Sequence, residues 1–432
     1  MPTKRVINIA LLGLGKLGTG FSKIIKEKQE KIKEETGFEL RLKKILIKNP
    51  HFKRDRSVDM SLLTTNVEDI ISDKSIDIAI DAIGGIEPTF SIIRQLVQNK
   101  IHIVSANRTL LASKMHDLAD LANLHKIYIL PEPSLGGGIP IISAIQRDLI
   151  ANKVHSVIGI LSGTSNFILS EMSKSGFSLS EVLQSPQIQE IAESLSIIDY
   201  EGSDAAQKLS IIAAAAFGID ISYLHIHAEG ISDITAEDIR HASELGFEIK
   251  LLAIMKDHPD KFEIHVHPTL VAKDHPLISV RGRYNAFLIE TDLIGNYLLY
   301  GKGVGIEATS SVIIRDIVEI ANLVYHSPRK GTYRLDWNEK DVMPIEEIRS
   351  SYYVRFPCHD KPGVIGSIAT ILGNFDINIG SAHAEVEKNS PEKSGFVHIL
   401  IDDAVERDVI NAINEISKLD LVRDEIKFFR IL

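Results

Sequence analysis

Apolar runs alternate with segments of helical spacing over the first 130 residues. Residues 6–12 (VINIALL) form a run rich in β-branched side chains, as in a strand buried on both faces. Further runs of this kind follow at residues 40–47, 76–83, 101–105 and 127–130. Strands that alternate with helices predict a parallel sheet with right-handed crossovers, whose ligands bind beyond the carboxyl ends of the strands. We therefore expect a Rossmann-type nucleotide-binding domain over residues 1–140.

The pattern after residue 140 favours longer strands mixed with helices. Segments rich in strand formers lie at residues 250–255, 261–266, 277–280 and 285–299. This mixture indicates an α+β domain with a mixed sheet over residues 141–326, whose long apolar strands suggest contact between subunits. Its last helix, at residues 310–324, is expected to pack back on the first domain.

The end of the chain repeats a smaller pattern of strands and helices. From residue 352 the order is βαββαβ, which is typical of a ferredoxin-like fold. We expect this unit over residues 351–432, after a polar linker at 327–350. The predicted fold class is therefore α/β, with a parallel N-terminal sheet, a central α+β domain and a ferredoxin-like C-terminal domain.

The composition narrows the range of partners. With 48 Lys and Arg against 58 Asp and Glu, the net charge is −10 and no basic patch dominates, which argues against a nucleic-acid partner. The single Cys358 excludes an intrachain disulfide and favours a reducing compartment. We see no signal peptide, and the longest apolar stretch is too short for a membrane span of about 20 residues. We expect a cytoplasmic protein with no membrane partner.

A glycine-rich loop follows the first strand and opens the first helix. It reads Gly13-Leu14-Gly15-Lys16-Leu17-Gly18, a GxGxxG pattern. The first glycine permits a tight turn, the second lets the backbone approach a pyrophosphate, and the third allows close packing of helix on strand. Glycines also mark ordinary turns, but a strand before this loop and a helix after it favour dinucleotide binding.

Basic residues follow the second strand, where NAD-specific folds of this type usually carry an acid. They are Lys48, Lys53, Arg54 and Arg56. Positive charge suits a 2′-phosphate, so NADP is favoured while NAD stays open. The alternative, that these are solvated loop charges, has nearly equal weight.

An acidic stretch from Glu193 to Lys208 leads into the most apolar helix of the chain. We expect this helix to have Ser203 or Asp204 as its N-cap and to end at Gly218. Asp204 and Lys208 are four residues apart, so they share one helix face. An ammonium beside a carboxylate can act as a proton donor that the carboxylate holds in place. The alternative is an exposed ion pair of little energetic value.

Several long motifs, in order along nearly the whole chain, resemble those of homoserine dehydrogenase with a C-terminal ACT domain. They are GLGKLG (13–18), VSANRTLLA (104–112), EPSLGGGIPII (132–142), GILSGTSNFIL (159–169), the stretch 193–208, HPLISVRGRYNAF (275–287) and GKGVGIEATSSV (301–312). The segment DKPGVIGSIATIL (360–372) resembles the ACT signature. So many motifs in the right order argue against a chance match.

The resemblance implies an NAD(P)-dependent enzyme that interconverts L-homoserine and L-aspartate 4-semialdehyde in threonine, methionine and isoleucine biosynthesis. It implies that Lys208 is the proton donor and that Asp199 helps to position it. Glu193 and Asp204 would bind the amino-acid substrate. The cofactor-binding residues expected from the loop and the resemblance are Gly13, Leu14, Gly15, Lys16, Leu17, Gly18, Lys48, Arg108 and Gly305.

Two further sites and an assembly follow from the resemblance. A monovalent cation such as sodium is expected on the backbone oxygens of Glu132, Leu135, Gly137 and Ile139. The ACT domain is expected to bind an amino-acid effector, threonine by resemblance, with Asp360, Gly363 and Asn378 as candidates. Plain turn chemistry is an equally open alternative for these three residues. Since ACT pockets normally form between two such domains, we expect a homodimer or homotetramer.

Departures from the family pattern leave other functions open. Arg108 stands where the family usually has Lys, and Ser194-Leu195-Ser196 replaces a segment with an acid and a proline. These changes motivate an alternative function, a non-catalytic amino-acid sensor that kept the fold. A third option is an oxidoreductase for another amino-acid-derived aldehyde. The intact set of Glu193, Asp204 and Lys208 favours the dehydrogenase.

Overall fold

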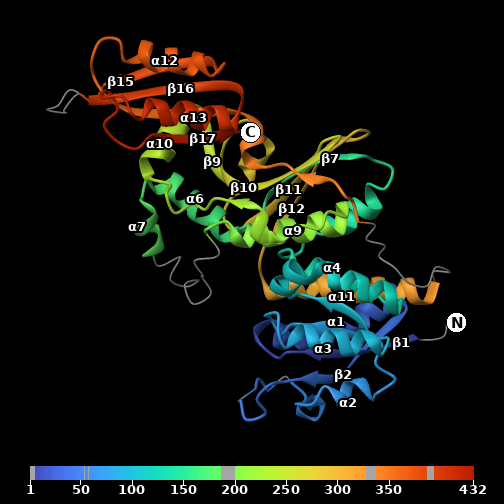
Figure 1. Cartoon of the computed structure of the whole chain (residues 1–432). Helices are drawn as coiled ribbons and strands as arrows, with labels where there is room; N and C mark the ends of the chain where they lie inside the picture. The colour runs from blue at the N-terminus through green and yellow to red at the C-terminus, as the bar shows by residue number, and fades with distance from the viewer. Residues whose placement is uncertain (1–4, 53, 57, 186–199, 327–336, 387–393) are drawn as a thin grey trace.

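Two sheets organise the chain in the computed structural model, which describes residues 5–52, 54–56, 58–185, 200–326, 337–386 and 394–432. Within these residues, one sheet of six strands forms the N-terminal part and one of eleven strands runs through the rest. Helices α4 (Arg108–His125) and α9 (Ser203–Phe217) lie between the two sheets (Figure 1). The expected α/β class is confirmed.

The N-terminal sheet is parallel throughout, in the order β3-β2-β1-β4-β5-β6. Its strands are β1 (Arg5–Leu12), β2 (Phe38–Leu46), β3 (Leu63–Thr64), β4 (Ile78–Asp81), β5 (His102–Ser105) and β6 (Ile129–Leu130). Its other helices are α1 (Lys16–Thr36), α2 (Glu68–Ile71) and α3 (Thr89–Gln98). Leu12 pairs with Leu46 and Asp81, and Asp81 with Ser105, so four strands end at one edge. Open α/β sheets bind ligands at this edge.

Helix α4 begins at Arg108, shortly after β5 ends at Ser105. Lys114 interrupts the helical backbone, with φ −137° and ψ 22°. The Asn107 side chain caps the helix by accepting a hydrogen bond from the Leu110 N–H. As a result, Arg108 lies in a first helical turn at the carboxyl edge of the sheet.

Helix α11 (Ile306–His326) follows the central domain in sequence but packs on the N-terminal domain. Ile313 and Ile317 join the core formed by Phe21 of α1 and the buried face of the parallel sheet. A Cβ at Gly20 would lie 2.1 Å from the Ile306 side chain, so the two helices approach closely at this point. This packing holds the start of α11 against the N-terminal domain.

The central sheet is mixed. Its described strands are β7 (Val154–Ile160), β8 (His227–Ala228), β9 (Phe247–Asp257), β10 (Lys261–Ala272), β11 (Tyr284–Thr291), β12 (Gly295–Lys302) and β13 (Asp341–Val342). Strands β9 and β10 form a long antiparallel hairpin, and β11 joins β7 to the edge strand β12. The described helices of this part, besides α9, are α5 (Ile141–Ser143), α6 (Gly163–Ser175), α7 (Leu179–Leu183) and α10 (Ala236–Glu244).

One predicted strand of the central domain is wrong. Residues 277–280 belong to a short 3-10 helix, Pro276–Ser279, whose cap residue His275 accepts a hydrogen bond from the Leu277 N–H. Proline at the first position favours this turn because it needs no N–H donor there. The predicted run at 285–299 covers parts of two strands, β11 and β12, which turn at Gly295 with φ 70°.

The C-terminal unit has the predicted βαββαβ order. It consists of β14 (Arg349–His359), α12 (Val364–Asn374), β15 (Asn378–Val386), β16 (Ser394–Val405), α13 (Glu406–Ile416) and β17 (Lys427–Ile431). Strand β17 pairs with β14 inside the unit and also with β10 of the central domain. The ferredoxin-like sheet therefore continues the central sheet.

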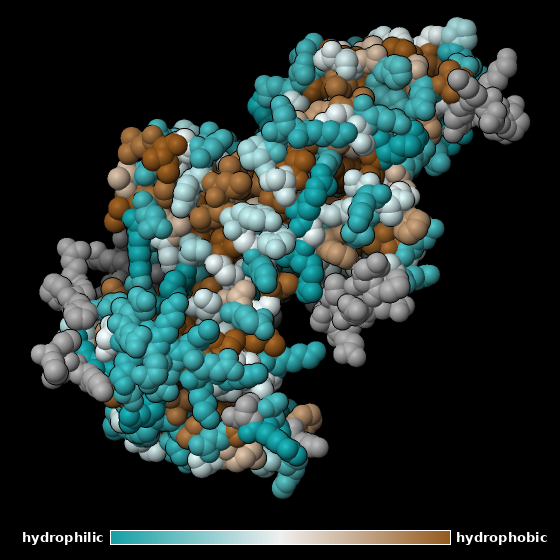
Figure 2. All heavy atoms as spheres, turned by 180° about the vertical axis from the view of Figure 1, so that it is seen from behind, coloured by the Kyte–Doolittle hydropathy of each residue, from teal (hydrophilic) through white to brown (hydrophobic). Residues whose placement is uncertain are grey.

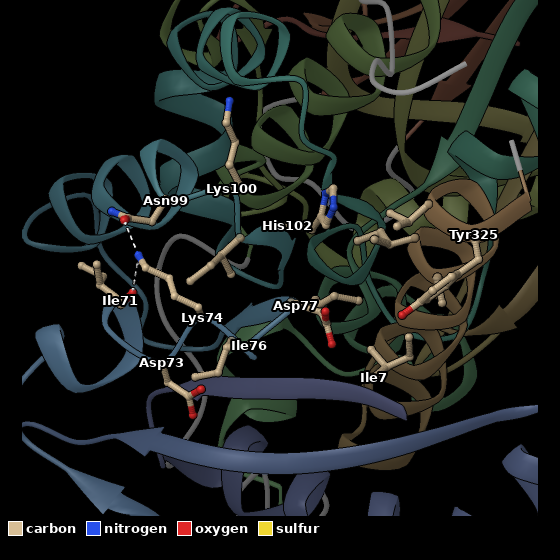
Figure 3. Close-up of a pocket in the computed structure, with 15 residues that line it drawn as sticks. Ile7, Ile71, Asp73, Lys74, Ile76, Asp77, Asn99, Lys100, His102 and Tyr325 are labelled. Atoms are coloured by element: carbon tan, nitrogen blue, oxygen red, sulfur yellow. Dashed lines mark hydrogen bonds between the residues drawn. The ribbon is translucent and has the colours of Figure 1, made fainter. Parts of the chain in front are cut away.

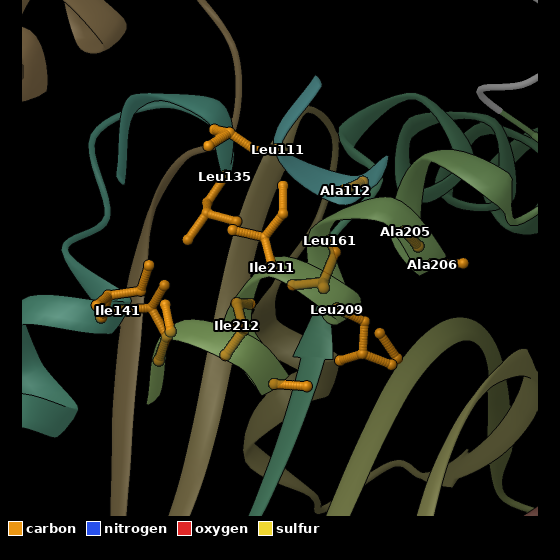
Figure 4. Close-up of a cluster of buried hydrophobic side chains, with 14 of the residues drawn as sticks. Leu111, Ala112, Leu135, Ile141, Leu161, Ala205, Ala206, Leu209, Ile211 and Ile212 are labelled. Atoms are coloured by element: carbon orange, nitrogen blue, oxygen red, sulfur yellow. The ribbon is translucent and has the colours of Figure 1, made fainter. Parts of the chain in front are cut away.

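A shared apolar core joins the N-terminal and central domains (Figure 4). Leu111 of α4 and Leu135 of the turn after β6 meet Leu209 and Ile211 of α9 in this cluster, and all four side chains are at most 1% exposed. Because α9 is nearly all apolar after Lys208, it can be buried on several sides at once. The core holds α9 against the N-terminal domain.

The polarity of the molecular surface differs between the domains. On the face shown in Figure 2, the N-terminal domain is mostly hydrophilic, whereas apolar side chains gather on the central domain. The hairpin of β11 and β12 exposes Leu293, Ile294 and Tyr300 at 66%, 54% and 52%. Such an apolar edge is typical of protein–protein contact. Among the described residues, no helix combines the length and apolarity needed to cross a membrane.

Candidate active site

Lys208 lies on α9 with a side chain that is 4% exposed. Its Nζ donates to Asp204 Oδ2 at 2.8 Å and to the backbone oxygen of Leu161 at 2.6 Å. An ammonium leaves water at high cost unless it is paired and hydrogen-bonded. The Asp204–Lys208 pair is therefore buried, which contradicts its interpretation as an exposed surface pair.

Asp204 joins Lys208 to the N-terminal domain. Its Oδ1 pairs with the Arg108 guanidinium while its Oδ2 accepts from Lys208. Arg108 directly follows the end of β5, in the first turn of α4. The carboxylate thus holds two cations from two domains, and the ammonium lies beside the carboxyl edge of the parallel sheet.

The expected N-cap of α9 is wrong. Gly202 caps the helix in the left-handed conformation, with φ 83°, and no side chain makes the cap hydrogen bond. A Cβ at Gly202 would also lie 2.8 Å from the Glu229 backbone oxygen, so conformation and space both require glycine. Because Gly202 occupies the cap, Asp204 falls inside the first turn and its carboxylate reaches Arg108 and Lys208.

The turn after β6 brings the triple glycine against Lys208. Gly136 and Gly137 have φ 107° and 74°. A Cβ on Gly136 would lie 3.4 Å from Lys208 Nζ, and one on Gly137 would lie 1.8 Å from the Lys302 backbone oxygen. The Gly138 N–H donates to the same oxygen at 3.1 Å. Glycine is required where these two backbones meet, and the turn lies between the ammonium and the end of β12.

The four residues expected to bind a monovalent cation, Glu132, Leu135, Gly137 and Ile139, lie on this buried turn. The Glu132 carboxylate is engaged elsewhere, since it accepts from the backbone N–H groups of Ile142 and Ser143 at 2.9 Å each. A cation here would therefore have to use main-chain oxygens, of which those of Glu132 and Ile139 also accept hydrogen bonds from the Leu135 and Ile141 N–H groups at 3.1 Å each.

The glycine loop at residues 13–18 has the geometry of a phosphate-binding turn. A Cβ at Gly13 would lie 2.6 Å from the Ala82 oxygen, and one at Gly18 would lie 2.2 Å from the Gly13 oxygen. Gly15 begins α1 without a side-chain cap, and the space at its Cβ position is open. The first turn of α1 carries no acid. An uncapped helix N-terminus facing open space fits a cofactor pyrophosphate.

The basic residues after β2 differ in their exposure and in their contacts with this loop. Lys48 and Arg56 are exposed, and Lys53 lies outside the described residues. Arg54 donates to the Leu14 oxygen at 3.2 Å and to the Asn49 oxygen at 3.0 Å, which ties this segment to the glycine loop. Gly305 links β12 to α11 with φ 134°, a conformation that favours glycine.

Two expected site residues, Glu193 and Asp199, lie outside the described residues. The sequence analysis in turn missed Asn285 on β11. Its Nδ2 donates to the Leu161 oxygen at 3.1 Å, the same oxygen that accepts from Lys208. Asn285 Oδ1 is buried without a hydrogen-bond partner, and a Cβ at Gly303 would lie 2.1 Å from it. The motif at 275–287 contains Asn285, but no spacing indicates that it reaches Lys208.

Asp81, at the end of β4, was also missed. It accepts from Ser105 Oγ at 2.9 Å and from the Ile83 N–H at 3.2 Å, which fixes the chain where β4 and β5 end. Burial raises the pKa of Asp81 to about 6. An aspartate in an apolar strand run such as IDIAIDAI could have suggested a buried polar role at the ligand edge.

Asp360 and Gly363 line a pocket of about 310 Å³ between the N-terminus of α12 and the strands β15 and β16. Asn378 begins β15 and is not among the residues that line this pocket. The structure thus brings together two of the three effector candidates.

Another pocket, of about 210 Å³, lies at the amino ends of the parallel strands. His102 at the start of β5 and Tyr325 of α11 are among its lining residues (Figure 3). It lies on the edge of the sheet opposite to Arg108 and Lys208, so it does not belong to the candidate active site.

Three family models match successive parts of the chain. The NAD binding domain of homoserine dehydrogenase matches residues 13–132, homoserine dehydrogenase itself matches 140–318, and the ACT domain matches 352–418. The homoserine dehydrogenase of Synechocystis sp. is 35% identical over 435 residues, with 99% of each chain covered. That of Helicobacter pylori is 35% identical over 432 residues, with the same coverage.

The solved structures agree with the sequence comparison. The crystal structure of a homoserine dehydrogenase from Thiobacillus denitrificans has a TM-score of 0.91 at 34% identity, covering 99% of this chain and 98% of that chain. One from S. aureus has a TM-score of 0.77 at 30% identity, covering 99% of both chains. The chain therefore belongs to the homoserine dehydrogenase family of NAD(P)-dependent oxidoreductases, in the form that carries a C-terminal ACT domain.

Proposed function

We propose that L-homoserine and L-aspartate 4-semialdehyde are interconverted beside Lys208, where α9 meets the carboxyl edge of the N-terminal sheet. The observation that carries this proposal is the buried ammonium of Lys208. Asp204 and the Leu161 oxygen hold it at 2.8 and 2.6 Å, and the Gly136 turn leads from it toward the cofactor domain. A placed proton donor beside a dinucleotide site is what reduction of an aldehyde needs.

Lys208 donates a proton to the aldehyde oxygen during reduction and removes one from the hydroxyl during oxidation. A bound nicotinamide supplies or accepts the hydride. Because negative charge develops on the aldehyde oxygen as hydride is added, the donor must already be in place. Asp204 keeps the ammonium oriented, and by the family motif Asp199 assists it.

The substrate is a zwitterion, so its two charged ends need different partners. The N-terminus of α6, with Ser162 as its cap, lies next to Leu161 and suits the substrate carboxylate. By the family motif, Glu193 and Asp204 bind the ammonium and hydroxyl end. The cation on the oxygens of 132–139 would add to the hydrogen bonds of Glu132 in holding the glycine turn in shape.

For the cofactor we propose NADP rather than NAD. Lys48 and Arg56 are exposed, and Arg54 is anchored to the glycine loop through the Leu14 oxygen. Positive charge after β2 would suit a 2′-phosphate. The support is electrostatic, so the cofactor preference should fall as salt rises.

We also propose that the ACT domain binds threonine as a feedback effector and that the chain forms a homodimer or homotetramer. The pocket lined by Asp360 and Gly363 supports the first part. The exposed apolar side chains of the β11–β12 hairpin support the second, because a hydrophobic edge strand is stable in water when another chain covers it.

The test is an assay of NADPH and NADH oxidation with L-aspartate 4-semialdehyde, with and without threonine. We expect faster turnover with NADPH and a lower rate when threonine is added. No turnover with either cofactor, by a folded protein that still binds an amino acid, would support the non-catalytic sensor instead. If the rate of turnover is the same with and without threonine, only the regulatory part of the proposal is wrong.

A further inference from the structure

We propose that His241, Glu385 and His398 bind a transition-metal ion, Zn²⁺ by its ligand chemistry, at the junction of the central and ACT domains. His241 lies on α10, Glu385 on β15 and His398 on β16. One ligand atom from each side chain lies within 4.8 Å of the others. Two imidazoles and a carboxylate form a ligand set that Zn²⁺ commonly takes, with water in the fourth position.

The separations are close to those that a metal requires. His398 Nε2 lies 3.4 Å from Glu385 Oε2, and His241 Nδ1 lies 3.7 Å from the same oxygen. Metal–ligand bonds of 2.0–2.2 Å in a tetrahedron place ligand atoms roughly 3.4 Å apart. The three side chains therefore need only small rotations to surround an ion.

His398 supplies an observation that is independent of this clustering. The residue is 6% exposed, and its Nε2 is buried without a hydrogen-bond partner although it is aimed at Glu385. A buried ring nitrogen left without a hydrogen bond is costly. Its Nδ1 lies 2.8 Å from the Tyr353 hydroxyl. In the tautomer that donates from Nδ1 to Tyr353, Nε2 carries the lone pair that a metal needs.

The charges around the three ligands suit a dication. Glu237 and Glu244 each place a carboxylate oxygen 3.7 Å from a ring nitrogen of His241. Arg355 is neutralised by Asp238 at 2.8 Å, so it opposes a bound cation only weakly. Arg240 is the opposing group, since its Nη2 lies 3.1 Å from His241 Nε2. When a metal occupies Nδ1, Nε2 becomes an N–H donor that can turn to Glu237 while Arg240 moves to Glu244, which it already contacts at 3.0 Å.

A metal at this place would connect two domains. Its ligands come from a helix of the central domain and from two strands of the ACT domain, and Glu385 also lines the pocket that contains Asp360 and Gly363. A ligand in that pocket would therefore affect the metal site, and the metal would affect the pocket.

The test uses the full-length protein, treated with chelator and then titrated with Zn²⁺. We expect one Zn²⁺ per chain beyond any adventitious ions, and a rise in melting temperature on binding. His398→Ala and Glu385→Gln should remove this ion, and Tyr353→Phe should weaken its binding about tenfold or more. His225→Ala is the control, because this exposed histidine is not among the three ligands.

Arg240→Gln gives a result that a merely structural histidine cluster does not predict. Since Arg240 competes for His241 Nε2, its removal should tighten Zn²⁺ binding. If His398→Ala and the His225→Ala control bind Zn²⁺ with the same stoichiometry and affinity, the proposal is wrong. Circular dichroism of each variant shows whether the loss of Zn²⁺ comes from unfolding, and Glu385→Gln, a substitution at a half-exposed position, keeps the test decisive if His398→Ala does not fold.

Discussion

At the scale of single residues, Asp204 connects the N-terminal domain to the helix that carries Lys208, within the candidate active site. It is 7% exposed and pairs with Arg108 from the N-terminal domain as well as with Lys208 on its own helix. Sequence could predict the second pair, because a separation of four residues brings side chains together on any helix. It could not predict the first, because Arg108 is far away in sequence and reaches Asp204 only through the packing of α4 on α9.

Asp204→Asn should lower turnover about 10²-fold, because the ammonium of Lys208 loses the charge that orients it. The Michaelis constant for the cofactor should change less than turnover, since Asp204 contacts the expected cofactor-binding residues only through Arg108. Steady-state kinetics with both substrates varied would measure this. The exposed Asp233 provides the control, and an equal loss in Asp233→Asn would show that the effect is unspecific.

Alanine substitutions at Gly137 and Gly176 can separate two effects on stability, the lack of space for a Cβ and the left-handed backbone conformation. Their φ values are 74° and 72°, but a Cβ at Gly137 would lie 1.8 Å from the Lys302 oxygen, whereas the space at Gly176 is open. Both alanine variants should pay about 1 kcal/mol for the left-handed conformation. Gly137→Ala should lose about 1–3 kcal/mol more from overpacking, measured by urea unfolding. Equal losses in the two variants would contradict the close approach of these backbones.

The buried carboxyl group of Asp81 should make the free energy of unfolding depend on pH. Burial raises its pKa to about 6, above the free value of about 3.9. The folded chain therefore holds a proton that the unfolded chain has lost, and the free energy of unfolding falls as pH rises from about 4 to about 6. Unfolding in urea at several pH values should show a smaller fall in Asp81→Asn than in the unchanged protein. Parallel pH profiles would mean that Asp81 does not titrate in this window.

At the scale of elements, the sequence predicted the kind and order of most helices and strands but not how the sheets join. Alternating runs were sufficient for the parallel sheet, and the βαββαβ pattern was sufficient for the ACT domain. The pairing of β17 with β10 has no local signal, because it depends on where two distant segments meet. The strand predicted at 277–280 failed because Pro276 and the His275 cap stabilise a turn.

Arg430 on β17 tests how strongly this junction holds the domains together. Its guanidinium is 3% exposed and lies between Glu406 of the ACT domain and Glu229 of the central domain. Arg430→Met would leave the buried Glu406 carboxylate without its partner, so we expect a loss of about 3–5 kcal/mol in the free energy of unfolding. Arg349→Met, which removes an exposed pair with Asp403, should change little. Similar losses in both variants would show that burial of Arg430 contributes nothing.

At the scale of the whole molecule, the candidate active site lies where the N-terminal and central domains share one core (Figure 4). That core holds α9 against α4 and the turn after β6, so Lys208 faces the edge at which a parallel sheet binds its ligands. The ACT domain is remote from Lys208 but continues the central sheet through β17. A Cβ at Gly202, the cap of α9, would lie 2.8 Å from the backbone oxygen of Glu229, whose side chain pairs with Arg430. Glu229 therefore lies close both to the ACT domain and to the start of α9.

The most direct measurement compares the unchanged protein with Lys208→Ala in the NADPH-linked reduction of L-aspartate 4-semialdehyde, together with cofactor binding by fluorescence. We predict that the variant loses turnover by about 10²–10⁴-fold and binds NADPH as tightly as before. Undiminished turnover, or a parallel loss of turnover and cofactor affinity, would contradict the assignment of Lys208 as the proton donor.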